Sequence, residues 1–188
     1  RLRGDGWVQV SSDPAGAEIF LFRYCEHDRR LIPVPVVTGA SLPLGRELER
    51  VDPDRPPEAQ CSNHNRLGVA PTGQIPVAMG SYLCVLRHPD RAVVRLPLLV
   101  ERGARVAARV HLPEQAALSG DFVHVPAGPF LAGGDPEAVA SGPRREVELP
   151  GFFISRHAVT CREYLEFLHH LAERDPGEAH RRCPRSAP

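Results

Sequence analysis

Two glycines in the stretch PAGPFLAGGD have a spacing that suggests phosphate chemistry. Gly128 and Gly133 lie as far apart as the glycines of a phosphate-binding loop, whose backbone amides surround an anion. That loop continues with Lys and then Ser or Thr, whereas this chain has Gly134 and Asp135 in those places. Pro129 also removes one amide donor, and the Asp135 carboxylate would repel a phosphate. We therefore expect no nucleotide site here.

Histidines near the C-terminus raise the question of a metal site. Glu166 and His170 are four residues apart, so on a helix they would share one face. Two ligands are fewer than the three that a catalytic zinc takes from a protein. A solvated helix surface explains this pair better, and we extend that interpretation to His157, His169 and His180. The sequence contains no GxSxG, HExxH or kinase catalytic loop. We predict no catalytic, cofactor-binding or metal-binding residue in this chain.

The cysteines are odd in number and none belongs to a CxxC pair. They are Cys25, Cys61, Cys84, Cys161 and Cys183. This pattern favours reduced thiols in a cytoplasmic protein, although the sequence alone leaves a disulfide open.

Charge and hydropathy exclude several classes of partner. The 23 basic and 23 acidic side chains give a formal net charge of zero, which argues against a nucleic-acid or anionic-membrane surface. The short basic run EAHRRCPR does not change this expectation. No apolar run reaches about 18 residues, so we predict no transmembrane helix. A protein or peptide partner stays open, and so does the oligomeric state.

The two ends of the sequence suggest an internal piece of a longer protein. The chain begins RLRGDGWVQV, without Met or a signal-peptide pattern, and ends CPRSAP without a closing structural element. We expect flanking segments on both sides.

Alternating apolar and polar residues predict β-strands in the first part. In RVAARVHL, one face carries Val106, Ala108, Val110 and Leu112, and the other carries Arg105, Arg109 and His111. Similar short runs are WVQVS, AEIFLFRY, SYLCVLR and AVVRLPLLV, and the Pro97 in the last run predicts an edge strand or a bulge. With 20 prolines and 16 glycines, the pattern predicts a mainly β protein that starts with a small antiparallel β-sandwich over residues 6–113. Residues 25–66 interrupt the pattern, and we interpret them as a long mobile insertion with a solvated charged surface.

Residues 121–188 predict a second module of the α+β type, with two hairpins and one amphipathic helix. The strands are DFVHVPAG and PFLAGG, then REVELP and GFFISR. Thr160 and Glu163 have the spacing of a capping box, so the helix should begin there. Its apolar face would carry Tyr164, Phe167, Leu168 and Leu171, and Asp175-Pro176-Gly177 would end it. We expect 174–188 to be poorly ordered and 121–173 to depend on the sandwich.

The first module resembles a PEGA-type domain. The resemblance rests on Ser12-Asp13-Pro14-Ala15-Gly16-Ala17 between two strands and on Gly80-Ser81-Tyr82 before another. In this chain the usual Thr-Pro element is inverted to Pro71-Thr72, and the insertion is long. Domains of this family are regarded as binding or spacer modules.

The second module resembles the opening of the formylglycine-generating enzyme, or sulfatase-modifying factor, family. The matching positions are Phe122, Pro126, Gly128, Phe130, Pro143, Val147, Phe152 or Phe153, Ile154, Val159, Thr160, Tyr164 and Phe167. The chain departs from the family pattern at Leu131-Ala132, at His157-Ala158 and at Cys161. These departures are similar to those of bacterial proteins that join a Ser/Thr protein kinase, a PEGA-like spacer and this module.

This resemblance implies a domain of which only the N-terminal part is in the chain. The copper-binding cysteine pair, the calcium sites and the substrate groove of the family lie in the later two-thirds of the domain. Copper and calcium would thus belong to the complete domain, and Cys161 and Cys183 are not assigned as its redox pair. The function expected is that of a catalytically incomplete piece of a kinase-linked, formylglycine-generating-enzyme-like protein. The alternative is a non-enzymatic binding or scaffolding module with a degenerate enzyme-like domain.

Overall fold

Most of the regular structure consists of β-strands in the computed structural model, which describes residues 4–36, 52–118 and 121–184. Contacts divide the chain into two compact units, Arg1–Ile154 and Ser155–Pro188. The predicted fold class is confirmed: the protein is mainly β, its sheets are largely antiparallel, and its helices lie near the C-terminus.

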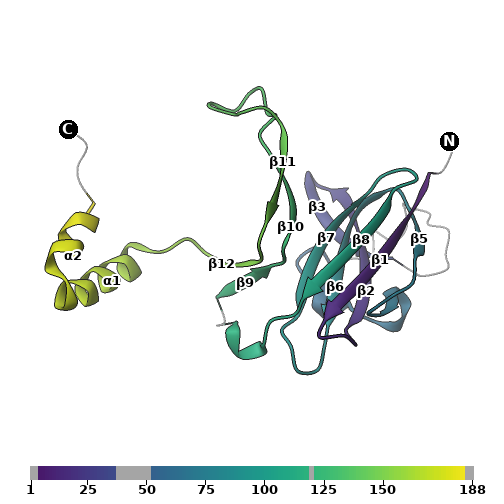
Figure 1. The fold of residues 1–188 in the computed structure, drawn as a ribbon, viewed down its shortest axis with the longest axis horizontal. Helices are drawn as coiled ribbons and strands as arrows, with labels where there is room; N and C mark the ends of the chain where they lie inside the picture. Colours follow the sequence, from purple (N-terminus) through teal and green to yellow (C-terminus); the bar gives the residue numbers. More distant parts are fainter. Residues whose placement is uncertain (1–3, 37–51, 119–120, 185–188) are drawn as a thin grey trace. The chain divides into compact units, whose positions relative to one another are not determined.

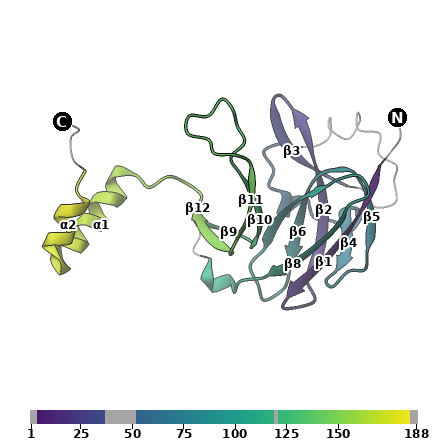
Figure 2. The same cartoon turned by 45° about the horizontal axis from the view of Figure 1, so that its top comes forward.

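The first unit begins with two sheets that face each other (Figures 1 and 2). The smaller sheet has the order β5-β1-β8, and the larger has the order β3-β2-β6-β7 with β4 also paired to β2. Their bounds are Asp5–Asp13 (β1), Glu18–His27 (β2), Arg30–Pro35 (β3), Arg66–Val69 (β4), Ile75–Ala78 (β5), Gly80–Arg87 (β6), Val94–Val100 (β7) and Arg105–His111 (β8).

The inward-facing residues of both sheets form one hydrophobic core. Val8 and Val10 from β1 pack there with Ile19 and Leu21 from β2, together with Tyr82, Cys84 and Leu86 from β6, Val94 and Leu96 from β7 and Val110 from β8. Full burial of a large aliphatic side chain is worth about 1.5–3 kcal/mol, so the alternation seen in the sequence determines which face of each strand lies inside.

One strand pair differs from the antiparallel sandwich predicted. β1 and β8 are parallel, with Trp7 opposite Arg105 and Asp13 opposite His111. Alternation specifies which side chains point inward but not the direction of the neighbouring strand. The sequence pattern therefore could not predict the parallel pairing of β1 with β8.

The predicted insertion at 25–66 is wrong where the structure describes it. Residues 30–35 form β3, and Ile32 and Val34 of that strand are buried. Further on, short 3-10 turns at Pro57–Gln60 and Asn63–Asn65 precede β4. Cys61 in this segment packs against a second cluster made of Phe20, Phe22, Leu83 and Val85 on the outer face of the larger sheet. The charged stretch 45–51 lies outside the described residues.

The turn that joins the two sheets at Pro71-Thr72 is held by hydrogen bonds to β1. The Thr72 side chain is only 8 % exposed, and its Oγ1 accepts a hydrogen bond from the Val10 backbone N–H at 3.0 Å. In return, the Thr72 N–H donates to the Val10 carbonyl at 2.9 Å. Burying this hydroxyl is tolerated because it is hydrogen-bonded.

After the sandwich, the chain forms a ribbon of four short strands. They are β9 (Phe122–Val125), β10 (Gly128–Ala132), β11 (Arg145–Leu149) and β12 (Phe152–Ser155). The two sequential hairpins predicted here are wrong, because β10 pairs with β11 and β9 pairs with β12. The breaks after β9 and after β11 lie opposite each other: a Cβ on Gly151 would stand 3.4 Å from the backbone N of Ala127. The β9–β10 stretch and the β11–β12 stretch of the ribbon are therefore interrupted at facing positions.

The second unit contains two helices where one was predicted, α1 (Cys161–Arg174) and α2 (Pro176–Arg182). The predicted start of α1 is confirmed: Thr160 Oγ1 accepts from the Glu163 N–H at 3.3 Å, and the Glu163 carboxylate accepts from the Thr160 N–H at 2.7 Å. Leu168 and Ala179 are buried, and the Tyr164 hydroxyl donates to the Arg182 carbonyl at 2.6 Å. The expectation of poor order from 174 onward is wrong for 176–182, and 185–188 lie outside the described residues.

A proline-lined groove as candidate functional site

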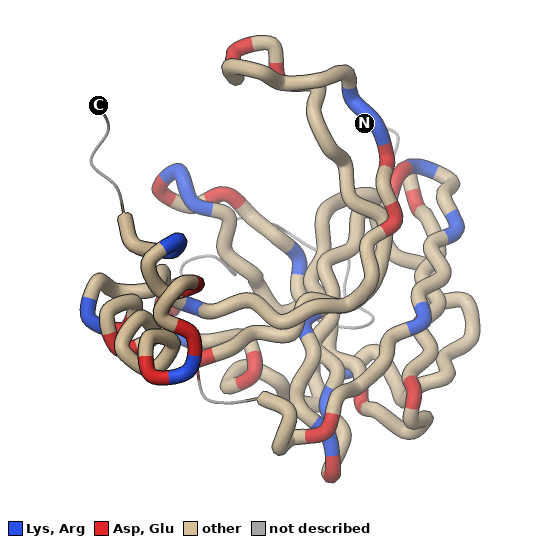
Figure 3. The backbone as a smooth tube through the Cα atoms, turned by 60° about the vertical axis from the view of Figure 1, so that its left-hand side comes forward, with Lys and Arg blue, Asp and Glu red and all other residues tan. Residues whose placement is uncertain are grey.

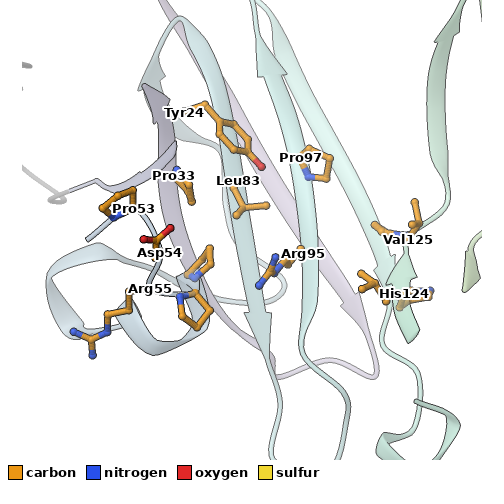
Figure 4. Close-up of a pocket in the computed structure, with 14 residues that line it drawn as sticks. Tyr24, Pro33, Pro53, Asp54, Arg55, Leu83, Arg95, Pro97, His124 and Val125 are labelled. Carbon is orange, nitrogen blue, oxygen red and sulfur yellow. The ribbon is translucent and has the colours of Figure 1, made fainter. Parts of the chain in front are cut away.

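A groove with a volume of about 440 Å³ lies on the outer face of the larger sheet (Figure 4). Its floor is the sheet itself, where Tyr24, Leu83 and Arg95 come from three adjacent strands. Its remaining lining comes from the segment 53–57, from Pro33 and Pro97, and from 123–126 at β9. Concave, mostly apolar sites with a few polar groups are the usual places for ligands.

An ion pair holds one wall of the groove to the sheet. The Arg95 guanidinium donates two hydrogen bonds to the Glu58 carboxylate, the Nη2–Oε2 bond at 2.8 Å. These bonds raise the pKa of Arg95 further above its usual value, while partial burial opposes the rise. Because the pairing is bidentate, it positions the turn at Pro57–Gln60 more firmly than a single contact would. The local charge is neutralised, so the groove offers shape and apolar surface more than charge.

His124 is the titratable group at the β9 side of the groove. Its ring packs against Phe153 at a centroid distance of 5.2 Å, and its Nδ1 is buried without a hydrogen-bond partner among the described residues. Burial lowers the pKa of His124, and the nearby His111 lowers it further. The ring is therefore neutral at pH 7, as an apolar contact with Phe153 requires. This residue was not singled out from the sequence, where an isolated histidine on a short strand carries no signal.

The glycine stretch that suggested a phosphate loop has a structural role. Gly133 and Gly134 have φ values of +73° and +85°, and the Gly134 N–H donates to the Gly142 carbonyl at 2.9 Å. A Cβ on Gly133 would come within 2.5 Å of that carbonyl oxygen, so only glycine fits. The Gly134 amide thus closes the loop between β10 and β11.

The other candidate ligands are dispersed over exposed surface. His170 lies 3.9 Å from Glu173 rather than beside Glu166, and both partners are more than three-quarters exposed. In the run EAHRRCPR, Glu178 binds the guanidinium groups of Arg181 and Arg182, which lowers the pKa of Glu178. In the part of the chain that the structure describes, acidic and basic positions are interspersed along the backbone (Figure 3).

The described residues do not fit the metals of the enzyme family. They contain no group of three or more His, Cys, Asp or Glu side chains that could hold an ion. All five cysteines lie in the described ranges and none is in a disulfide. Burial raises the pKa of the Cys84 thiol to about 12, and mainly burial raises that of Cys61 to about 11, so neither offers a thiolate at neutral pH.

The prediction of no transmembrane helix can be compared with the length and hydropathy of the helices in the structure. Neither α1 nor α2, nor any other helix within the described ranges, is long and apolar enough to cross a bilayer.

Comparison with protein families gives a match for the C-terminal part of the chain. Residues 108–186 match the model of the family described as sulfatase-modifying factor enzyme 1-like domain. The match starts inside β8, continues through β9–β12 and ends after α2. It covers less than half of the 188 residues. No curated protein and no solved structure shows significant similarity to the chain. The C-terminal part of the chain is thus similar to the sulfatase-modifying factor enzyme 1-like domain.

Proposed function

We propose that this chain is part of a formylglycine-generating-enzyme-like protein, to which residues 121–184 contribute the first strands and helices of an enzyme-like domain. In this proposal the reactive cysteines, copper and calcium belong to other residues of that domain. The sandwich acts as a PEGA-like binding or spacer module. The match of 108–186 to the family supports the assignment.

The observation that carries the proposal is the apolar surface of the matched segment. In β10 and β11, Phe130 lies opposite Val147 and Gly128 lies opposite Leu149, so these residues share one face. The other face carries Glu146 and Glu148, opposite Leu131 and Pro129. Several large side chains of the ribbon are at least 41 % exposed, namely Phe122, Phe130, Leu131, Phe152, Phe153 and Ile154.

An isolated two-stranded ribbon is marginally stable, so a ribbon with large apolar side chains exposed is typical of a strand pair that packs against further structure. Exposed apolar side chains on both faces of these strands indicate contacts with further structure. We assign this surface to the remainder of the enzyme-like domain. By the same family resemblance, we propose that a Ser/Thr protein kinase belongs to the same polypeptide. The five cysteines outside disulfides support a cytoplasmic location.

The second candidate function is a non-enzymatic binding module, which the proline-lined groove favours. In that case the sandwich would recognise a protein or peptide through the groove, and the enzyme-like segment would serve as a scaffold. The two candidates differ in what the gene encodes next to this segment.

The experiment has two arms. The first reads the gene on both sides: a kinase glycine-rich loop upstream and a cysteine-bearing enzyme-like continuation downstream would support the proposal, and a stop codon directly after Pro188 would favour the binding module. The second arm incubates the chain with copper, oxygen and a Cys-x-Pro-x-Arg peptide and follows the cysteine by mass spectrometry. We expect no conversion to formylglycine, and conversion would refute the assignment of catalysis to other residues.

A further inference from the structure

The outer face of β1 and β8 carries two arginines, Arg105 and Arg109, that form no ion pair with any acid in the described part of the chain. Parallel pairing places Arg105 opposite Trp7 and Arg109 opposite Ser11. Both arginines are exposed, whereas Val106, Ala108 and Val110 of the same strand face the core. The sequence contains no lysine, so every basic side chain of the chain is an arginine with a fixed, planar set of donors.

Three other arginines on the sandwich, Arg66, Arg91 and Arg95, each pair with a carboxylate. Arg66 lies 3.0 Å from Glu18, and Arg91 lies 3.6 Å from Glu114. No ion pair involves Arg105 or Arg109 within residues 4–36, 52–118 and 121–184. The same face of β1 carries Asp5, two residues before Trp7, and Asp13, two residues after Ser11; Asp13 lies 4.0 Å from His111. Neither aspartate forms an ion pair with Arg105 or Arg109 among the described residues, so both guanidiniums are available to a partner.

The Arg105 side chain is already held in place. Its guanidinium carbon lies 5.8 Å from the centre of the Trp7 ring, a cation–π arrangement. Between the two arginines stands Ala107, whose small side chain leaves the strand surface open. A partner thus meets an oriented guanidinium, a flat stretch and a second guanidinium.

The backbone of β8 supplies a second mode of recognition. β8 ends the sheet β5-β1-β8, so no described strand pairs with its other side. Figure 1 shows β8 next to β1 at this end of the sheet. An extended peptide can add to such an edge through main-chain hydrogen bonds, with alternate side chains selecting the sequence.

We propose that β8 binds an extended acidic peptide by strand addition, with two carboxylates four residues apart contacting Arg105 and Arg109. Four residues of extended chain span about 13 Å on both strands. The spacing of the two carboxylates therefore matches the spacing of the two guanidiniums. Charge-assisted pairs with guanidinium are among the stronger polar contacts, and the planar donor set favours carboxylate. This binding site is independent of the enzyme-like assignment.

The test uses Trp7, the only tryptophan of the chain, as the reporter. The probe is a capped seven-residue peptide of valine and threonine with Glu at positions 2 and 6. We expect a saturable change in tryptophan fluorescence and a Kd that rises about tenfold in either Arg105→Ala or Arg109→Ala, since each loses one charged contact. The matched control is Arg87→Ala, because Arg87 also stacks on an aromatic ring, Phe20 at 5.9 Å, but in the larger sheet. Its Kd should not change.

Further probes test the charge contacts, the strand addition and the class of partner. A peptide with Gln in place of both Glu residues should bind at least tenfold more weakly, and equal binding would overturn the charge assignment. Alternate N-methylation of the peptide should abolish binding, and unchanged binding would overturn strand addition. In Arg109→Glu, a peptide with Arg at position 6 or position 2 should recover affinity. Oligothymidylate or anionic vesicles binding more tightly than the acidic peptide, or no saturable signal with the peptide, would overturn the proposal.

Discussion

The single polar residues with the clearest roles in this protein cap the ends of helices. Asp175 is the clearest case, since it ends one helix and begins the next. Its N–H donates to the Leu171 carbonyl at 2.7 Å, and its carboxylate accepts from the Glu178 N–H at 2.9 Å. The sequence Asp-Pro-Gly was interpreted only as the end of α1, yet Asp before Pro is equally the N-cap of a new helix with Pro at its first position. Local signals therefore existed for α2.

Loss of the Thr160 hydroxyl should loosen α1. Thr160→Ala removes the acceptor for the Glu163 N–H and should destabilise the helix by about 1 kcal/mol. Amide hydrogen exchange of the first turn, measured by NMR, should become about fivefold faster, while exchange in β2 and β6 stays the same. Thr160→Ser keeps the oxygen and serves as the control. Equal exchange in the alanine and serine variants would contradict this role of the cap.

Low pH should weaken the same capping box by protonating the Glu163 carboxylate. The Thr160 backbone N–H, followed by its hydroxyl, donates to Glu163 and lowers the pKa of that carboxyl below its usual 4.5. Because the folded pKa is the lower one, this contribution is complete above about pH 4.5 and is lost as the pH falls through the folded value.

An NMR titration of the Thr160 amide would check this acid dependence. We expect its shift to report a Glu163 pKa below 4.5 and the helical signals of α1 to decline in the same range. Glu163→Gln should remove the Thr160 titration while leaving that of Glu178, which has its own lowered pKa from Arg181 and Arg182. A Glu163 pKa at or above the usual value would refute the prediction.

At the scale of elements, the predictions succeeded where one face of a strand is buried and failed where pairing partners are distant. The edge position predicted from Pro97 is confirmed, since β7 ends its sheet. β3 was missed because Pro33 and Pro35 argue against a strand, but β3 is also at a sheet edge, where a missing donor is tolerated. The nested pairing of β9 with β12 was missed because hairpin signals act over a few residues only.

The two faces of the β6–β7 pair should respond differently to truncation. Leu86 is fully buried in the core between the sheets, so Leu86→Ala should cost about 2–5 kcal/mol by leaving a cavity. Leu99, on the neighbouring strand, is 57 % exposed, and Leu99→Ala should change stability by less than about 0.5 kcal/mol. Urea unfolding of both variants, followed by circular dichroism, would measure the difference. Similar losses for the two would mean that the larger sheet does not bury the face assigned to it.

At the scale of the whole molecule, the family match and the compact units divide the chain at different places. The match covers 108–186, whereas contacts separate Arg1–Ile154 from Ser155–Pro188. The ribbon therefore resembles the enzyme-like domain in sequence but folds with the sandwich. No candidate catalytic site was predicted from the sequence. The groove could not have been predicted either, because its lining comes from β2, β3, β6, β7, the turn before β4 and β9, which only the folded chain brings together.

The boundary between the two units should be the first point that a protease attacks. Residues 155–160 are all exposed, and apart from Ser155, the last residue of β12, they belong to no helix or strand; Arg156 among them is a trypsin site. Limited trypsin digestion should therefore cut after Arg156 before it cuts at Arg105 or Arg109, because strand backbone must open locally before it fits a protease. The fragment 1–156 should retain the thermal unfolding midpoint of the intact chain's sandwich, since its core residues all come from the first unit.

Arg156→Gln separates this prediction from a general sensitivity to trypsin. The variant should survive several times longer before the first cut, with the remaining sites cleaved at their former rates. If trypsin instead opened β8 first, or if the sandwich melted at a lower temperature once 157–188 were removed, the stability of the first unit would depend on the helices. The two units would then form one cooperative structure, and the exposed apolar side chains of α1, Leu165 and Phe167, would be the first place to look for the coupling.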